Sequence, residues 1–235
     1  MNNHSMTGSE IAKSGFKVEH LFITALDIKT SLDNFFNKQI KKIILAPPKK
    51  KFDIICIFDD DTKFNIQLKK IINFGSRGNS FDRRHICNTF ENPNMKRYLT
   101  LLSLSRPTKR STLMSKEQKK DFILLGNNHP NDVKQYLKNS LIGDEEKNDY
   151  FCIIKTNKKL SEYKLYIIKS EKLYESLEKS IDINISMKRN GTCLHLTPNI
   201  YLQRKGGGKS DRSPNHIQAK LKITRELLTN FNHIL

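Results

Sequence analysis

The residues with the clearest chemical potential are one carboxylate and, further along the chain, an amide and an ammonium group. Asp53 lies in the apolar run Phe-Asp-Ile-Ile-Cys-Ile-Phe, and Gln67 and Lys69 lie in Phe-Asn-Ile-Gln-Leu-Lys. Residues two apart on a strand project from one face, so Gln67 and Lys69 are expected together. Burying such groups costs free energy unless they are hydrogen-bonded, paired with an opposite charge or bound to a metal. The three residues are therefore a candidate site, with a plain strand start at Asp53 and a solvated strand end at Lys69 as the alternative.

The segments around these residues predict the elements that position them. The polar cluster Asp59-Asp60-Asp61-Thr62-Lys63 separates the two apolar runs, which predicts a β-hairpin. Apolar periodicity predicts further strands at 150–154 and 164–168. Helices are expected over 16–26 (with Ser14 as N-cap), 31–42, 95–104, 115–125, 132–141 and 170–180, and Asp82-Arg83-Arg84-His85 is expected to open another.

Near the C-terminus, two alternating segments predict a β-ribbon with a basic, glycine-rich tip. In 199–205, Tyr201, Gln203 and Lys205 share one face, and in 216–223 the apolar residues face inward while Gln218 and Lys220 face outward. A two-stranded ribbon fits the major groove of DNA, where Arg or Lys can donate to guanine and Gln can pair with base edges. A solvated surface hairpin is the alternative.

The arginines that follow Lys69 are a second candidate contact with DNA, either as a phosphate clamp or as a solvated turn. Together with the ribbon they make up the predicted DNA-binding set: Arg77, Asn79, Arg83, Arg84, Tyr201, Gln203, Arg204, Lys205, Gly206, Gly207, Lys209, Arg212, Gln218 and Lys220. Gly208-Lys209-Ser210 resembles the end of a phosphate-binding P-loop, but Gln203 stands where that motif requires glycine, so nucleotide binding is not expected.

Composition narrows the class of partner. The 235 residues carry 42 Lys and Arg against 24 Asp and Glu, a formal net charge of +18, which favours a polyanion such as nucleic acid. No apolar run approaches the roughly 20 residues that span a bilayer, and no signal peptide is recognisable, so a cytoplasmic protein without a membrane partner is expected. The widely spaced cysteines are expected to be reduced core thiols.

Several segments, taken in order, resemble one enzyme family. Asp53 followed by Gln67-x-Lys69 resembles the active site of the PD-(D/E)XK nuclease superfamily, in the variant with an amide in place of the second acid. The segments 12–19 (Ala-Lys-Ser-Gly-Phe-Lys-Val-Glu), 65–69, 78–85 (Gly-Asn-Ser-Phe-Asp-Arg-Arg-His) and 203–207 (Gln-Arg-Lys-Gly-Gly) resemble parts of small type II restriction endonucleases that read GCGC. The matches span about residues 10 to 223.

This resemblance implies an α/β fold with a mixed central β-sheet flanked by helices, in a single domain over 1–235. The catalytic core would lie at about 10–90 and the DNA-reading ribbon at about 199–223. The implied activity is Mg²⁺-dependent hydrolysis of double-stranded DNA at a short palindrome, by a monomer or weak homodimer. A non-catalytic DNA-binding protein and a less specific repair or recombination nuclease are the competing hypotheses.

The same resemblance assigns roles to individual residues. Asp53, Gln67 and the Leu68 carbonyl would ligate Mg²⁺ through hard oxygen atoms. Lys69 would position or deprotonate the attacking water and offset charge on the scissile phosphate. Glu19 would reach the same metals or their waters, with an exposed helical glutamate as the alternative. The amide at Gln67 leaves open whether one or two metals act.

Overall fold

The computed structural model describes most of the chain. The described residues are 8–75, 79–85, 93, 116–117, 120, 124, 128–144, 146–181, 186–188, 193–204 and 216–235; the side chains at 8–12, 84–85, 186–188, 204 and 216 are not described. The chain divides into two compact units. Unit 1 comprises 1–74, 145–170 and 226–235, and unit 2 comprises 75–144 and 171–225.

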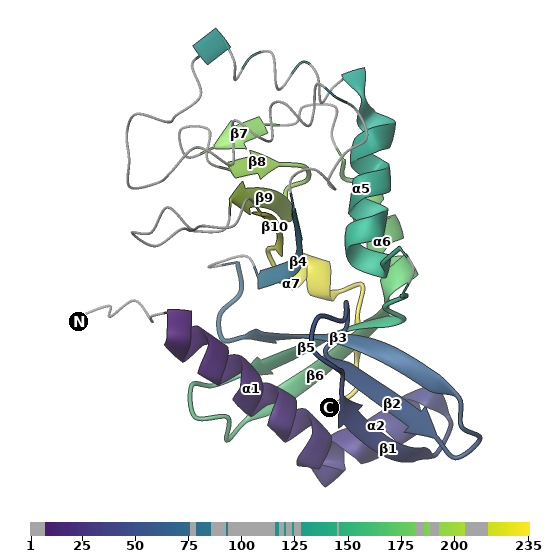
Figure 1. Ribbon diagram of the computed structural model, residues 1–235. Coiled ribbons are helices and arrows are strands. Elements are labelled where there is room, and N and C mark those ends of the chain that lie inside the picture. Colours follow the sequence, from purple (N-terminus) through teal and green to yellow (C-terminus); the bar gives the residue numbers. More distant parts are fainter. Residues whose placement is uncertain are drawn as a thin grey trace, which may run out of the picture. The chain divides into compact units, whose positions relative to one another are not determined.

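Unit 1 is built on a six-stranded mixed sheet in the order β1-β2-β3-β5-β6-β11 (Figure 1). Its central pair, β3 and β5, is parallel, and the other neighbours are antiparallel. The strands are β1 (Ile40–Leu45), β2 (Ile54–Phe58), β3 (Lys63–Ile71), β5 (Tyr150–Thr156), β6 (Tyr163–Lys169) and β11 (Asn232–His233). The expected β2–β3 hairpin is confirmed, with Ile54 opposite Ile66.

Helices α1 (Gly8–Thr24) and α2 (Leu26–Phe36) bury their apolar sides in the same core as this sheet (Figure 1). Val18 and Phe22 of α1 and Leu32 of α2 belong to a buried cluster that includes Ile54 and Ile66. At about 25 cal/mol per Å² of apolar surface removed from water, such burial is the main force that holds the helices on the sheet. The predicted α/β class, a mixed sheet flanked by helices, is confirmed.

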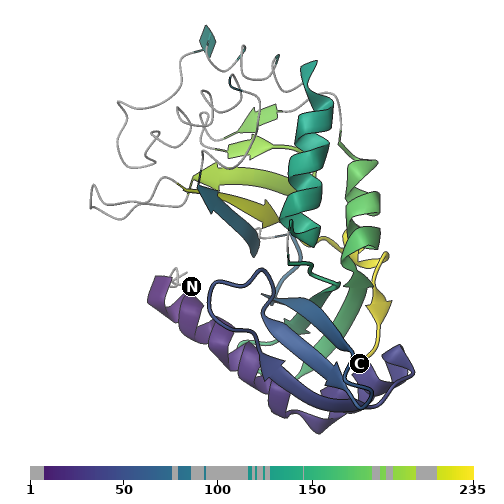
Figure 2. The same cartoon turned by 45° about the vertical axis from the view of Figure 1, so that its right-hand side comes forward.

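Unit 2 contains a five-stranded antiparallel sheet in the order β4-β10-β9-β8-β7. The strands are β4 (Asn79–His85), β10 (His216–Leu221), β9 (Ile200–Arg204), β8 (Cys193–His195) and β7 (Ser186–Lys188). Helix α5 (Pro130–Ile142) and helix α6 (Ser170–Glu178) lie side by side in both views (Figures 1 and 2), and Lys134 and Glu178 join them at 3.4 Å. A short helix, α7 (Arg225–Leu228), follows β10.

Strands β9 and β10 confirm the described part of the predicted ribbon. Gln218 pairs with Gln203 and Lys220 pairs with Tyr201, while Ile217, Ala219 and Leu221 are buried, as the alternation predicts. The tip at 205–215 lies outside the described residues. Strands β5 and β6 and helices α5 and α6 also confirm their predictions, to within two residues at each end.

Three boundary predictions are wrong. Helix α1 begins at Gly8, well before Ser14, because the helix formers ahead of Ser14 continue the helix; Ser14 Oγ instead accepts a hydrogen bond from Lys70 Nζ. The helix expected over 31–42 ends at Phe36, because Asn37 adopts a left-handed conformation (φ 48°) that terminates it, and β1 follows. Residues 82–85 belong to β4 and not to a helix, because pairing with β10 overrides local propensity.

Other predictions are tested only in part. The helices expected over 95–104 and over most of 115–125 lie outside the described residues. The single-domain organisation stays a prediction.

Cys56, Cys152 and Cys193 are buried free thiols, as expected, and burial raises the pKa of Cys56 to about 12. Across the described ranges, no helix is long and apolar enough to cross a membrane.

Candidate active site

Asp53 is held at the start of β2 by main-chain bonds to both neighbouring strands. Its N–H donates to the Ile66 carbonyl at 3.0 Å, and its carbonyl accepts from the Ala46 N–H at 2.9 Å. Its side-chain Oδ2 accepts a further bond from the Leu68 N–H at 2.8 Å. The backbone pairing of β2 with β3 ends at Ile54 and Ile66, and beyond it the Leu68 N–H bonds to the Asp53 carboxylate. The position of the carboxylate is therefore set by the backbone of the hairpin.

Lys69 forms an ion pair with the same carboxylate oxygen. The Lys69 Nζ to Asp53 Oδ2 distance is 3.1 Å, and the side chains are 15% and 29% exposed, respectively. A half-buried pair is screened less by solvent than a surface pair, so its geometry is better defined. The predicted proximity of Asp53 and Lys69 is therefore present in the structure.

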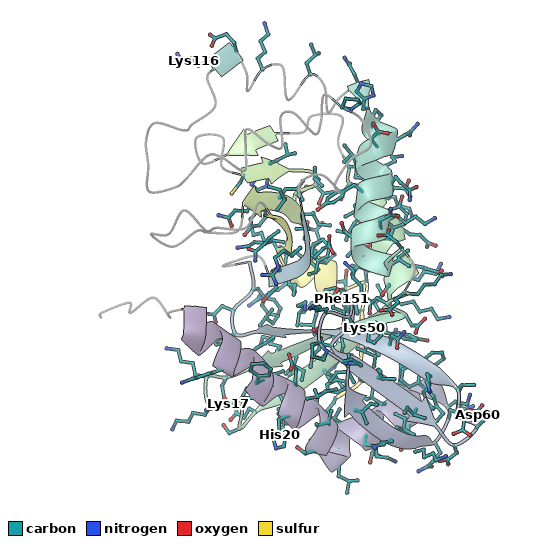
Figure 3. All side chains as sticks on the ribbon, in the orientation of Figure 1. Lys17, His20, Lys50, Asp60, Lys116 and Phe151 are labelled. Carbon is teal, nitrogen blue, oxygen red and sulfur yellow. The ribbon has the colours of Figure 1, made fainter. Side chains whose placement is uncertain are left out.

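Gln67 lies on the same face of β3 as Lys69 and is only 4% exposed. Its Nε2 donates to the Lys51 carbonyl at 3.3 Å, and its partner in the parallel β3–β5 pair is the fully buried Phe151, labelled in Figure 3. An amide whose nitrogen is engaged in this way has its oxygen oriented by the same bond. The Gln67 amide oxygen is therefore held in a fixed orientation on the face of β3 that carries Lys69.

Glu19 reaches this group from helix α1. Burial, first, and the negative charge of Asp53, second, raise the pKa of Glu19, while the positive charge of Lys69 acts in the opposite direction. Because the charges of Asp53 and Lys69 both affect the pKa of Glu19, its carboxyl group lies near both residues. Asp53, Gln67 and Lys69 therefore lie together on the hairpin, and Glu19 lies within electrostatic range of Asp53 and Lys69.

The donors present here fit a hard cation such as Mg²⁺. Mg²⁺ prefers oxygen ligands and is usually held by one or two carboxylates together with water and substrate oxygens. Asp53 and Glu19 supply carboxylates, Gln67 supplies an amide oxygen, and Asp53 Oδ1 accepts no hydrogen bond from the described part of the chain. Among the described residues there is no cluster of three or more His, Cys, Asp or Glu, so a dense protein cage for a metal is not built there.

The polar face of the unit 2 sheet aligns side chains from neighbouring strands in rows. Arg83 of β4 pairs with Gln218 of β10, which pairs with Gln203 of β9. In antiparallel strands, directly paired residues project from the same face. Arg83 is exposed and the two glutamines are half-buried. This row unites residues that the sequence placed in two separate candidate regions.

A second row contains Lys220, Tyr201 and a residue that sequence analysis missed. His195 of β8 pairs with Tyr201 and stacks on it, with ring centroids 5.2 Å apart and planes at 21°. The short strand 193–195 gives too little alternation for sequence alone to detect it. Its pairing with β9 is what places His195 beside the predicted residues.

Other predicted residues lie elsewhere or outside the described part of the chain. The register places Asn79 opposite the buried Leu221, and Arg84 opposite the buried Ile217. Arg204 is the last residue of β9, opposite Ile217. The remaining predicted DNA contacts lie outside the described residues: Arg77, Lys205, Gly206, Gly207, Lys209 and Arg212.

Comparisons with solved structures give a distant structural likeness. The fold is similar to a crystal structure of the restriction endonuclease MspI in complex with its cognate DNA, with a TM-score of 0.46 and 12% sequence identity over 91% of this chain and 80% of that chain. At this level the likeness does not assign an activity. No protein-family model matches the chain, and no curated protein matches it significantly.

Proposed function

We propose that this protein is a Mg²⁺-dependent type II restriction endonuclease that hydrolyses phosphodiester bonds in double-stranded DNA at a short palindrome. The observation that carries the proposal is the 3.1 Å pair of Asp53 and Lys69, beside the buried Gln67 amide on one face of β3. A carboxylate, a hard oxygen donor and an ammonium group in one place are what metal-assisted phosphodiester hydrolysis requires.

Each residue has a defined part in this chemistry. Asp53, Gln67 and the Leu68 carbonyl would hold Mg²⁺, which supplies Lewis-acid activation of the phosphate and of a water molecule. Lys69 would orient the attacking water and stabilise the negative charge that develops on the phosphate oxygens. The water oxygen would form a bond to phosphorus as one P–O ester bond breaks. The proton released by the water would pass to a nearby base, and the leaving sugar oxygen would take up a proton from solvent.

Glu19 is the group best placed to take part in that proton transfer or to contact the metal ligands. Its raised pKa makes it a stronger base than an ordinary carboxylate, and its proximity to Asp53 places two negative charges together. A divalent cation relieves that repulsion. Glu19 is therefore proposed as a participant of the metal site, which would accommodate one or two ions.

The unit 2 sheet is proposed to read the DNA. The net charge of +18 favours a polyanion. Glutamine and arginine side chains in a cross-strand row, such as Gln203, Gln218 and Arg83, are suited to base edges and phosphates. The ordered sequence motifs resemble those of the HhaI restriction endonuclease, so GCGC is the proposed target.

A plasmid digestion tests this function against its two competitors. The protein is incubated with plasmid DNA in Mg²⁺ or EDTA, and the fragment ends are sequenced. Discrete, EDTA-sensitive fragments whose ends all map to GCGC sites are expected. Binding without cutting would indicate a non-catalytic DNA-binding protein, and ends at many unrelated sequences would indicate a less specific nuclease.

A further inference from the structure

Helix α1 and strand β3 form a second polar cluster, on the side of β3 opposite Gln67 and Lys69. Lys70 follows Lys69 in the strand and so projects from the other face. Its Nζ donates to Ser14 Oγ of α1 at 2.9 Å. Lys17 lies one helical turn beyond Ser14, on the same side of the helix. An ammonium group of β3 and a hydroxyl of α1 are therefore joined, and a second ammonium group lies one turn further along the same helix.

Lys70 lies against the side of helix α1 that also carries Lys17, because its 2.9 Å bond to Ser14 joins the strand to that side. Lys13, which precedes Lys17 by one turn, is exposed on the same helix, and Figure 3 shows Lys17 on the outer side of α1. Holding like charges close together costs free energy unless an anion offsets it.

The protein does not supply that anion within the described residues. Other lysines of unit 1 are paired with carboxylates, namely Lys29 with Asp33, Lys38 with Asp60, Lys41 with Asp61 and Lys50 with Glu146. None of Lys13, Lys17 and Lys70 forms an ion pair with any residue in the described ranges. The cluster is therefore complementary to an external anion that can accept several hydrogen bonds.

We propose that Ser14, Lys17 and Lys70 bind a non-bridging phosphate oxygen of the DNA backbone beside the point of cleavage. The inference rests on the proposed nuclease function, because that function brings a phosphodiester chain to Lys69, whose neighbour in the strand is Lys70. One strand end would thus contact the DNA backbone on two sides, through Lys69 at the scissile phosphate and through Lys70 at a flanking one. This clamp would hold the DNA strand in register with the metal site.

The test pairs protein variants with chemically altered DNA. Duplexes that contain the proposed site carry a neutral methylphosphonate at one phosphate at a time, flanking the cleavage point. Binding is measured without Mg²⁺ for the wild type, Lys17→Gln and Lys70→Gln. The matched control is Lys159→Gln, which removes an exposed lysine from the β5–β6 turn of the same unit.

The expected result is a specific coupling. Lys17→Gln and Lys70→Gln should each weaken binding to the natural duplex about fivefold at physiological salt, the effect of losing roughly one phosphate contact. At one flanking methylphosphonate that loss should vanish, whereas Lys159→Gln should behave alike on every duplex. Losses that are the same at all positions, or that equal those of Lys159→Gln, would overturn the proposal.

Two further measurements separate the alternatives. Lysine acetylation followed by mass spectrometry should show that the duplex protects Lys17 and Lys70. Protection that instead grows with protein concentration, without DNA, would assign this surface to a second copy of the chain through the 67% exposed Phe16 and would overturn the proposal. Plasmid cleavage by the wild type is scored independently: coupling without cleavage would refute only the nuclease function, and cleavage without coupling would refute only the phosphate site.

Discussion

The two sheets of the molecule hold their polar residues in opposite ways. In the mixed sheet of unit 1, Gln67 is almost fully buried, and the Asp53 carboxylate is held by one backbone and one side-chain donor. In the antiparallel sheet of unit 2, Arg83 is exposed and Gln203 and Gln218 are half-buried in rows across the strands. One sheet presents fixed groups in a partly desolvated setting, and the other presents accessible ones.

This difference matches two physical tasks. Stabilisation of charge that develops in a reaction needs donors that are already oriented and shielded from water. Sequence reading needs side chains that can reach base edges from an exposed face. Substitutions at the catalytic residues of unit 1 should therefore reduce cleavage but keep discrimination between DNA sequences. Substitutions in the polar rows of the unit 2 sheet should reduce discrimination but keep cleavage.

The largest effect is expected for Lys69→Ala. Without the ammonium group, the charge that builds on the phosphate is no longer offset, so cleavage should fall by roughly 10²–10³-fold or more while binding to GCGC duplexes stays within a few-fold. Single-turnover cleavage and gel-shift assays measure the two quantities. Lys63→Ala, an exposed lysine at the start of the same strand, is the matched control. Full cleavage by Lys69→Ala would contradict the catalytic assignment.

Gln203→Ala and Gln218→Ala should have the next largest effect, on discrimination. If these side chains contact base edges, each substitution should cost roughly 1–3 kcal/mol of preference for the cognate site over a one-base variant, with the cleavage rate at saturation almost unchanged. Because the two residues are paired across strands, the double variant should be non-additive. Gln135→Ala on helix α5 is the control. An equal loss on all sequences would show that they do not read bases.

Lys220→Ala should act more weakly and without sequence preference. A lysine that meets a phosphate adds about 0.9 to the slope of log affinity against log salt, so that slope should become shallower by about this amount. Fluorescence anisotropy on cognate and non-cognate duplexes at several salt concentrations measures it. Lys172→Ala on α6, where the lysine pairs with Glu175, should leave the slope nearly unchanged. A change confined to the cognate duplex would make Lys220 a base contact.

The smallest effect is expected on stability, for Glu19→Gln in EDTA. The pKa of Glu19 is raised in the folded state above its ordinary value of 4.5, so its ionised form destabilises the fold at neutral pH. Glu19→Gln should therefore melt at a higher temperature than the wild type near pH 7–8, and the difference should shrink as the pH falls toward 4.5. Calorimetry across this range measures it.

The control for that prediction is Glu162→Gln, an exposed glutamate in the β5–β6 turn, which should leave the melting temperature almost unchanged. Added Mg²⁺ should stabilise the wild type more than Glu19→Gln, because the cation would offset the repulsion between Glu19 and Asp53. A lower melting temperature for Glu19→Gln at every pH would place Glu19 in a structural role.

Local patterns in the sequence were sufficient for much of the fold. The hairpin around Asp60, the alternation in β9 and β10, and the periodicity of α5 are set by residues close together in the chain, whose spacing alone decides which faces are apolar. The Asp53–Lys69 pair was predictable for the same reason, because a tight hairpin brings its two strands into register.

Only the tertiary structure decided which distant residues join these elements. Residues 82–85 became a strand because β10 offers them a partner, and the approach of Glu19 to Asp53 depends on how α1 packs on the sheet. The Lys70–Ser14 bond and the stacking of His195 on Tyr201 likewise join segments far apart in sequence. Strand pairing and helix packing depend on burial and on hydrogen-bond partners supplied elsewhere in the chain, and local spacing contains no record of these.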